Sequence, residues 1–169
     1  MAEHGIDLGR RGFLTGLLPS EPDVIRPPWS LEETIASACT GCGACVSACP
    51  QAIIRLDARQ RPEIDFSSGE CSFCGACAAA CPEPVFDRGR SGFQHVAVIG
   101  DTCFAARGIV CQSCGDACPE AAIRFQPRLG GPALPELAAT LCIGCGACIA
   151  ACPAAAIGTC PTAAEAAHA

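Results

Sequence analysis

Short apolar runs separated by polar turns recur along this chain of 169 residues. Residues 53–56 (Ile-Ile-Arg-Leu) and 62–66 (Pro-Glu-Ile-Asp-Phe) flank a polar stretch, which predicts a hairpin of two short strands. The same layout recurs where residues 123–125 and 133–137 flank a turn rich in Pro and Gly. Residues 96–99 (Val-Ala-Val-Ile) predict a further strand between the hairpins. The pattern therefore favours an α+β fold with small sheets.

A helix is expected ahead of the first hairpin. Ser30 is followed by Glu33, a capping-box spacing that favours a short helix ending at the first cysteine, Cys39. Pro27 and Pro28 require an extended chain before that helix. We expect this segment to pack as an arm against the structure that follows, with Trp29 as a buried anchor; a segment that binds a partner is the alternative.

The cysteines dominate the candidate chemistry. Sixteen of the 17 cysteines form four quartets, and each quartet ends in Cys-Pro. Three quartets have the spacing C-x2-C-x2-C-x3-C-P. The remaining one, the third along the chain, is stretched and has seven residues instead of two between its first two cysteines. The predicted ligands are Cys39, Cys42, Cys45, Cys49, Cys71, Cys74, Cys77, Cys81, Cys103, Cys111, Cys114, Cys118, Cys142, Cys145, Cys148 and Cys152.

This spacing is typical of bacterial ferredoxins with [4Fe-4S] clusters. Three cysteines lie on one loop, and Gly43, Gly75 and Gly146 supply a permissive backbone where side chains would crowd the cluster. The fourth cysteine ligates the other cluster in two-cluster ferredoxins. The sequence therefore predicts four clusters, three from regular quartets and one from the stretched quartet.

Two arrangements of the fourth cysteine are open. If adjacent quartets exchange it, the ligand sets are Cys39, Cys42, Cys45 with Cys81; Cys71, Cys74, Cys77 with Cys49; Cys103, Cys111, Cys114 with Cys152; and Cys142, Cys145, Cys148 with Cys118. A nested arrangement would instead pair the first quartet with the fourth and the second with the third.

The composition explains why clusters are needed. The hydrophobic fraction is 50%, but 31 of those residues are Ala and 17 are Cys. Apolar packing alone is thin, so metal ligation is expected to supply folding free energy. Disulfides are the first competing interpretation, but three thiols on one tight loop converge on a cluster more readily than they pair. Zinc is the second, yet zinc modules separate two C-x2-C knuckles by a longer loop.

The repeat also divides the chain. The first cysteines of successive quartets are 32, 32 and 39 residues apart. We expect an N-terminal arm and short helix at 1–36, two tandem bacterial-ferredoxin-like modules at 37–98 and 99–160 with two clusters each, and a flexible tail at 161–169.

The negative net charge of the chain limits the classes of partner that it could bind. The net charge is -6, from 11 Arg, no Lys and 17 acidic residues. No basic stripe is available for nucleic acid, so a protein with a positive surface is the better candidate partner.

No stretch approaches the ~20 apolar residues of a membrane span. Arg10-Arg11 opens a phrase like a twin-arginine signal, but the apolar run that follows is too short, which predicts a cytoplasmic protein.

The remaining candidate residues favour binding over catalysis. No nucleophile–base pair, phosphate loop or carboxylate constellation stands out, so we expect no enzyme. His4, His95 and His168 are expected to be surface residues, as is Asp116. Cys160 belongs to no quartet and is expected to be a free thiol.

Four phrases carry a family resemblance. They are residues 10–16 (Arg-Arg-Gly-Phe-Leu-Thr-Gly), 25–30 (Ile-Arg-Pro-Pro-Trp-Ser), 70–74 (Glu-Cys-Ser-Phe-Cys) and 99–103 (Ile-Gly-Asp-Thr-Cys). Together with the stretched quartet they resemble the NapF family of ferredoxin-type proteins from the periplasmic nitrate reductase system. The resemblance extends over nearly the whole chain.

The resemblance implies a cytoplasmic accessory protein with several [4Fe-4S] clusters. It implies association with the catalytic molybdenum subunit of periplasmic nitrate reductase before export, and a role in maturation of that subunit. The residues themselves indicate only a small acidic protein able to pass single electrons. A soluble electron-transfer polyferredoxin that serves a reductase, or a purely structural iron–sulfur module, therefore stays open.

Overall fold

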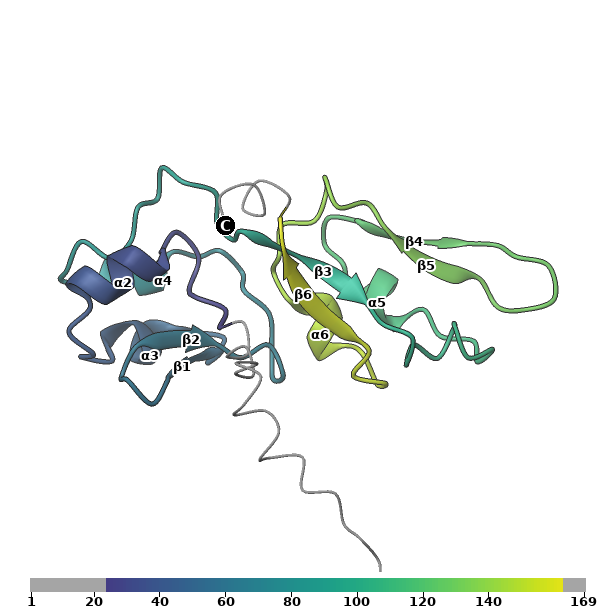
Figure 1. The fold of residues 1–169 in the computed structure, drawn as a ribbon, viewed down its shortest axis with the longest axis horizontal. Coiled ribbons are helices and arrows are strands. Elements are labelled where there is room, and N and C mark those ends of the chain that lie inside the picture. The colour runs from purple at the N-terminus through teal and green to yellow at the C-terminus, as the bar shows by residue number, and fades with distance from the viewer. Residues whose placement is uncertain (1–23, 163–169) are drawn as a thin grey trace, which may run out of the picture.

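The computed structural model describes residues 24–162 of the chain. The Arg10-Arg11 phrase, His4, His168 and most of the predicted tail lie outside the described residues. In chain order the elements are α2 (Glu32–Ala38), α3 (Ala44–Ala48), β1 (Ile54–Leu56), β2 (Pro62–Ile64), α4 (Ala76–Ala80), β3 (His95–Ile99), α5 (Ser113–Asp116), β4 (Ile123–Gln126), β5 (Leu134–Leu137), α6 (Ala147–Ala150) and β6 (Ile157–Pro161). The chain is thus a small mixture of short helices and short strands (Figure 1).

Three antiparallel pairs make up the sheets of the described residues. Strands β1 and β2 pair with Ile54 opposite Ile64, and β4 and β5 pair with Ile123 opposite Leu137. Both predicted hairpins are confirmed. Strand β3 pairs with β6, which is the last strand in the sequence, with Ile99 opposite Ile157. This pairing closes the second half of the structure on itself.

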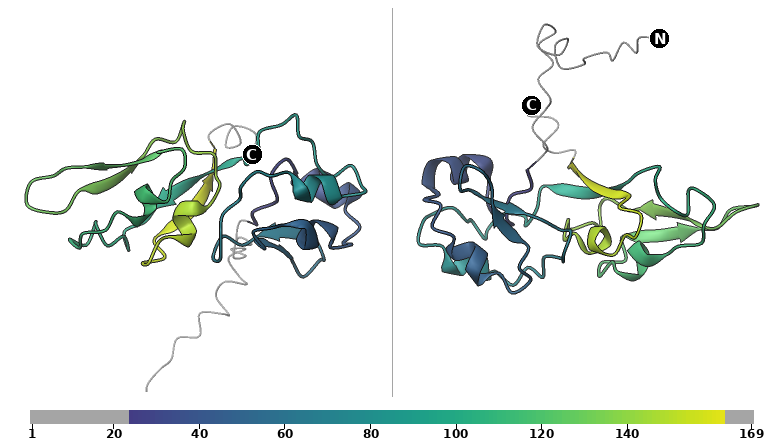
Figure 2. Two further views of the ribbon diagram at one scale, coloured as in Figure 1. Left: turned by 180° about the vertical axis from the view of Figure 1, so that it is seen from behind. Right: turned by 90° about the horizontal axis from the view of Figure 1, so that it is seen from below.

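Two lobes follow from these pairings. The first lobe comprises residues 24–88 and the second lobe residues 95–162, and they lie side by side along the long axis in the front, back and bottom views (Figures 1 and 2). Because β3 pairs with β6, residues 95–98 belong to the sheet of the second lobe. Residues 89–94 connect the lobes.

Each lobe has its own small core. The core of the first lobe contains Ile53, Ile54, Ile64 and Phe66. The core of the second contains Ala97, Ile123 and Ile157. Two buried cysteines complete each core, namely Cys45 and Cys77 in the first lobe and Cys114 and Cys148 in the second. The buried cysteines therefore belong to the same clusters as the apolar side chains of each core.

The arm at residues 24–31 corrects two sequence predictions. Helix α2 does end at Ala38 and leads into Cys39, but its N-cap is Leu31, whose N–H donates to the Thr34 hydroxyl at 3.1 Å. Ser30 instead donates to the carbonyl of Pro27 at 2.7 Å. Pro27 and Pro28 are fully buried, whereas Trp29 is half-buried. The prolines, and not Trp29, therefore anchor the arm.

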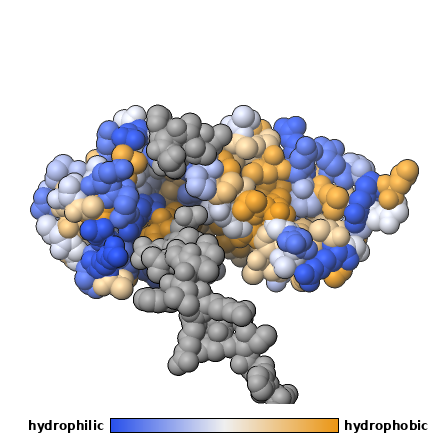
Figure 3. Space-filling model, viewed as in Figure 1, coloured by the Kyte–Doolittle hydropathy of each residue, from blue (hydrophilic) through white to orange (hydrophobic). Residues whose placement is uncertain are grey.

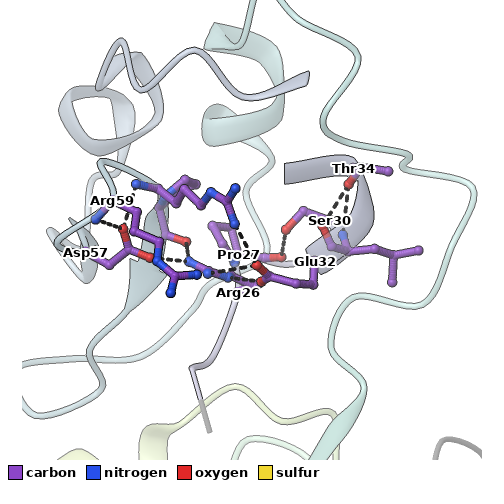
Figure 4. Close-up of polar contacts among 10 residues, drawn as sticks. Arg26, Pro27, Ser30, Glu32, Thr34, Asp57 and Arg59 are labelled. Atoms are coloured by element: carbon purple, nitrogen blue, oxygen red, sulfur yellow. Dashed lines mark hydrogen bonds and ion pairs between the residues drawn. The ribbon is translucent and has the colours of Figure 1, made fainter. Parts of the chain in front are cut away.

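Arg26 ties this arm to the first hairpin. Its Nε donates to Glu32 at 2.6 Å, and one terminal nitrogen donates to both Asp57 at 3.1 Å and the carbonyl of Pro62 at 3.0 Å (Figure 4). The side chains of Arg26 and Asp57 are only 13% and 16% exposed. A charged pair this shielded contributes more to stability than an exposed pair does.

Replacing Arg26 with Ala is expected to lower the free energy of unfolding by about 2 kcal/mol, since the Asp57 carboxylate loses a charged donor. Arg90→Ala, at an exposed position, serves as the matched control. Urea unfolding of the cluster-loaded protein under anaerobic conditions measures the difference. Equal stability of the two variants would contradict this role of Arg26.

The effect of Arg26 should depend on pH. The hydrogen bond from Arg26 lowers the pKa of Glu32. Burial opposes ionisation of Asp57, but the N–H of Arg61 and the Arg26 guanidinium outweigh it and its pKa is lowered. A carboxyl group whose pKa is lowered by folding stabilises the folded protein at a pH above its pKa in the unfolded chain. This stabilisation is lost as the pH falls through the pKa of the group in the folded protein. The gap between wild type and Arg26→Ala should therefore be full at neutral pH and shrink below about pH 4.

Among residues 24–162, none of the helices has the length and apolar character needed to cross a bilayer.

Candidate metal centres

Four cavities of similar size are each lined by four cysteines. Their volumes, including the part open to solvent, are between 330 and 410 Å³. We number them by the quartet that supplies three of the cysteines. Site I has Cys39, Cys42, Cys45 and Cys81; site II has Cys71, Cys74, Cys77 and Cys49; site III has Cys103, Cys111, Cys114 and Cys152; site IV has Cys142, Cys145, Cys148 and Cys118.

The structure groups the cysteines as the crossed arrangement does. Each site takes its fourth cysteine from the neighbouring quartet of the same lobe. The first and fourth quartets, which a nested arrangement would join, line different cavities. All 17 cysteines are free thiols here.

Short helices position one cysteine of every site. Cys45, Cys77, Cys114 and Cys148 are each the second residue of a helix, and all four are buried. Cys114 belongs to the stretched quartet, so this quartet presents its third cysteine as the regular quartets do. The helix therefore holds the same part of the site in all four cases.

The extra residues of the third quartet form a closed excursion. The N–H of Arg107 donates to the carbonyl of Cys103 at 3.1 Å, and the N–H of Ile109 donates to that of Phe104 at 2.9 Å. The segment thus turns back on itself and returns the chain to Cys111. This explains how a spacing of seven residues, in place of the usual two, leaves the four cysteines of site III together.

The glycines before three of these helices adopt the left-handed conformation. Gly43, Gly75 and Gly146 have φ of 72°, 76° and 81°. A side chain is disfavoured in that conformation, which supports the predicted role of these glycines. The corresponding residue of the third quartet is Gln112, with φ of -134°, so the stretched loop enters its helix by another path.

A strained turn after the fourth cysteine was not foreseen from the sequence. Ala52, Ala121 and Ala155 have φ of 53°, 47° and 45°, a region that L-residues rarely adopt. The next N–H donates to sulfur in two cases, from Ala122 to Cys118 and from Ala156 to Cys152, each at 3.3 Å. The recurring phrase Cys-Pro-x-Ala is the signal that could have revealed it. Such hydrogen bonds stabilise thiolate sulfur and tune a bound metal.

Burial affects the acidity of several thiols. It raises the pKa of Cys148 to about 12, and the pKa values of Cys71 and Cys114 to about 11. Nearby cysteines of the same site raise the pKa of Cys148 further, because adjacent thiolates repel one another. These thiols are protonated at neutral pH unless a positive centre stabilises the thiolate, so metal binding at these sites must release protons.

The donor set fits a cluster better than a single ion. Within residues 24–162 no three side chains of Cys, His, Asp or Glu are close enough to share one metal ion. Zinc requires its sulfur ligands at ~2.3 Å from one point. Four cysteines that surround a larger volume, with soft sulfur donors, match the ligation of an iron–sulfur cluster.

His95 corrects another prediction. It lies in β3, is half-buried, and its Nε2 is 2.9 Å from the carbonyl oxygen of Gly144 in the loop of site IV. Burial lowers its pKa. Cys160 lies on β6 opposite Val96 and lines none of the four sites. Asp116 is exposed, as expected.

Comparisons with known proteins agree with this chemistry. The 4Fe-4S dicluster domain family matches residues 38–85 and 107–156, so its second match begins after Cys103. The chain is 44% identical over 154 residues to the ferredoxin-type protein NapF of Escherichia coli K12, covering 90% of this chain and 94% of that protein. It is 47% identical over 131 residues to NapF of Haemophilus influenzae, covering 76% and 74%. It is also 33% identical over 160 residues to the methylamine utilization ferredoxin-type protein MauM of Methylobacillus flagellatus, covering 80% and 68%.

Proposed function

We propose that sites I to IV each hold one [4Fe-4S] cluster in this chain, which belongs to the NapF family of ferredoxin-type iron–sulfur proteins. The observation that carries this proposal is the grouping of sixteen cysteines into four cavities, four to a cavity. Each lobe would then be a two-cluster bacterial-ferredoxin-like module. Such a cluster supplies a one-electron redox centre when bound.

The residues of the chain would hold and tune these centres. The buried helical cysteines fix one ligand of each site, and the αL glycines keep side chains away from three of them. The N–H groups of Ala122 and Ala156 donate to Cys118 and Cys152 and would stabilise those ligands as thiolates. The proposed role is binding and electron transfer, with no catalytic residue.

The biological role that we propose is maturation of another protein. The partner would be the catalytic molybdenum subunit of periplasmic nitrate reductase, bound in the cytoplasm before that subunit is exported. Family membership along 90% of the chain supports this. Six of the seven large apolar side chains exposed among residues 24–162 lie in the second lobe, and Figure 3 also shows much apolar surface there, so we propose the second lobe as the side that contacts the partner.

A soluble electron carrier is the second candidate function. Cys42 of site I and Cys74 of site II are exposed, so redox centres at these sites would be open to a soluble partner. Under this alternative the protein donates electrons to a reductase and has no part in its assembly.

Deletion of this protein from its host separates the two roles. Under the maturation role, the catalytic subunit purified from the deletion strain should lack part of its iron or molybdenum. A gene copy with Cys160→Ser should restore the metal content, because Cys160 lines none of the four sites, and a copy with Cys45→Ser should not. A catalytic subunit complete in its cofactors but slow in turnover would refute maturation and favour the carrier.

A further inference from the structure

The two lobes meet at cysteines of sites II and IV. The backbone N–H of Cys71 donates to the carbonyl of Cys145 at 2.8 Å. Cys71 lines site II in the first lobe, and Cys145 lines site IV in the second. Two ligand loops from different lobes are therefore hydrogen-bonded directly to each other.

The topology explains why site IV, and not site III, faces the first lobe. Strand β3 enters the second lobe at His95 and pairs with β6, which follows the fourth quartet. Figure 1 shows α6 and β6 on the side of the second lobe nearest the first lobe, with α5, β4 and β5 beyond them. Cys148 of site IV lies on α6 and Cys114 of site III lies on α5. Site III thus lies farther from the first lobe than site IV does.

Aromatic side chains fill the junction between the lobes. Phe66 of the first lobe is buried, and a Cβ built on Gly146 would lie only 2.1 Å from its ring. Phe66, Phe93 and His95 pack together, with ring centroids 4.8 to 6.1 Å apart. Of the eight Phe and Trp residues (7 plus 1), four gather here, namely Trp29, Phe66, Phe73 and Phe93. The junction is therefore packed like a core.

The backbone of Phe73 is a second sign that the junction between the lobes is tightly packed. Its φ is 53°, in a position where the first and fourth quartets have Gly41 and Gly144 at φ of 71° and 73°. An aromatic residue in the left-handed region is strained, and such strain persists only where the surroundings hold it. Phe73 packs against Trp29 and Phe93, with centroids at 6.0 and 5.5 Å. The loop of site II thus has a strained Phe where glycine would be unstrained, and this Phe extends the aromatic packing at the junction.

We propose that the four sites form one electron-transfer row in the order I, II, IV, III, and that electrons cross between the lobes from site II to site IV beside the Cys71–Cys145 hydrogen bond. This rests on the proposed function, in which every site holds a [4Fe-4S] cluster. In the crossing step one electron leaves site II, which is oxidised, and reduces site IV. No bond forms or breaks and no proton moves. The electron is supplied by an external one-electron reductant, which is dithionite in the test below.

The test compares two glycines with the same backbone cost. Gly146 and Gly43 occupy the same place in Cys-Gly-Ala-Cys and have φ of 81° and 72°. A methyl group on Gly43 would find its nearest atom, in Leu56, at 3.9 Å, whereas one on Gly146 collides with Phe66. Gly146→Ala should therefore push the lobes apart, and Gly43→Ala should not.

The readout is electron paramagnetic resonance of the dithionite-reduced proteins at two microwave frequencies, with iron and sulfide content. Spin–spin splitting does not scale with frequency, so it reports neighbouring reduced sites. We expect Gly146→Ala to lose the part of this splitting that joins the lobes, while wild type and Gly43→Ala keep it. Hydrogen exchange at Cys71 should accelerate in Gly146→Ala alone.

Three outcomes are decisive. The same splitting in Gly146→Ala and wild type, with faster exchange at Cys71, would overturn the row. If Gly146→Ala retains less iron than Gly43→Ala, then Phe66→Leu replaces it, because Phe66 lies outside the ligand loops. Unchanged splitting in that variant, with faster exchange at Cys71, would equally overturn the row. A wild-type protein with clearly fewer than about sixteen irons would instead refute the four-cluster function on which the row rests.

Discussion

Changing Cys42 and Cys81 together to Ser should cost the protein one intact cluster, the same loss as either change alone. Changing Cys42 and Cys49 together should cost two. The reason is that Cys42 and Cys81 line site I, whereas Cys49, although from the same quartet as Cys42, lines site II. A site that lacks one thiolate ligand cannot keep a fully ligated four-iron cluster.

Mössbauer spectroscopy of the iron-57 protein counts the intact clusters. Three are expected in each single variant and in Cys42→Ser/Cys81→Ser, and two in Cys42→Ser/Cys49→Ser. Cys160→Ser is the control and should keep four, because Cys160 lines no site. The reverse result, two clusters with the Cys42/Cys81 pair and three with the Cys42/Cys49 pair, would mean that each quartet binds its own cluster.

Local spacing predicted three of the four cysteines that line each cavity, because these three belong to one quartet and lie close together in the chain. Cysteines two and three residues apart force a tight loop, and the Cys-Pro that follows turns the fourth thiol away from it. The stretched quartet could be interpreted in the same way, since the excursion from Cys103 to Cys111 closes by its own hydrogen bonds. The hairpins could be predicted from short apolar runs on either side of a polar turn, which is also a local pattern.

The predictions failed where distant residues decide the outcome. Ser30 had the residue type and spacing of a helix cap, yet it forms an antiparallel β-bridge with the distant Phe86, and its hydroxyl donates to the carbonyl of Pro27 instead. His95 was expected to be a surface residue, but its strand pairs with β6, whose residues 157–161 come much later in the chain. No periodicity announces such a pairing, so the order of the four sites was also beyond the sequence. Phe73 shows the same limit, since its strain makes sense only beside Trp29 and Phe93.

Removing iron and sulfide is expected to unfold both lobes. Every helix of the described residues has at most seven residues and every strand at most five, lengths that do not persist alone in water. Buried cysteines also form part of each core, so losing the clusters leaves that packing incomplete. Ligand binding of this kind contributes on the order of 10 kcal/mol per structural metal site, which is comparable to the whole stability of a small domain.

The measurement is far-UV circular dichroism with limited proteolysis, before and after anaerobic chelation of the iron. Most helix and strand signal should disappear, cleavage should extend into both lobes, and anaerobic reconstitution with iron and sulfide should restore the signal. If apolar packing alone folds the chain, the iron-free protein would instead keep its circular dichroism spectrum and unfold cooperatively on heating. In that case Ile53, Phe66 and their neighbours would suffice to fold the chain, and the raised pKa values of Cys71, Cys114 and Cys148 would describe protonated thiols in a preformed scaffold.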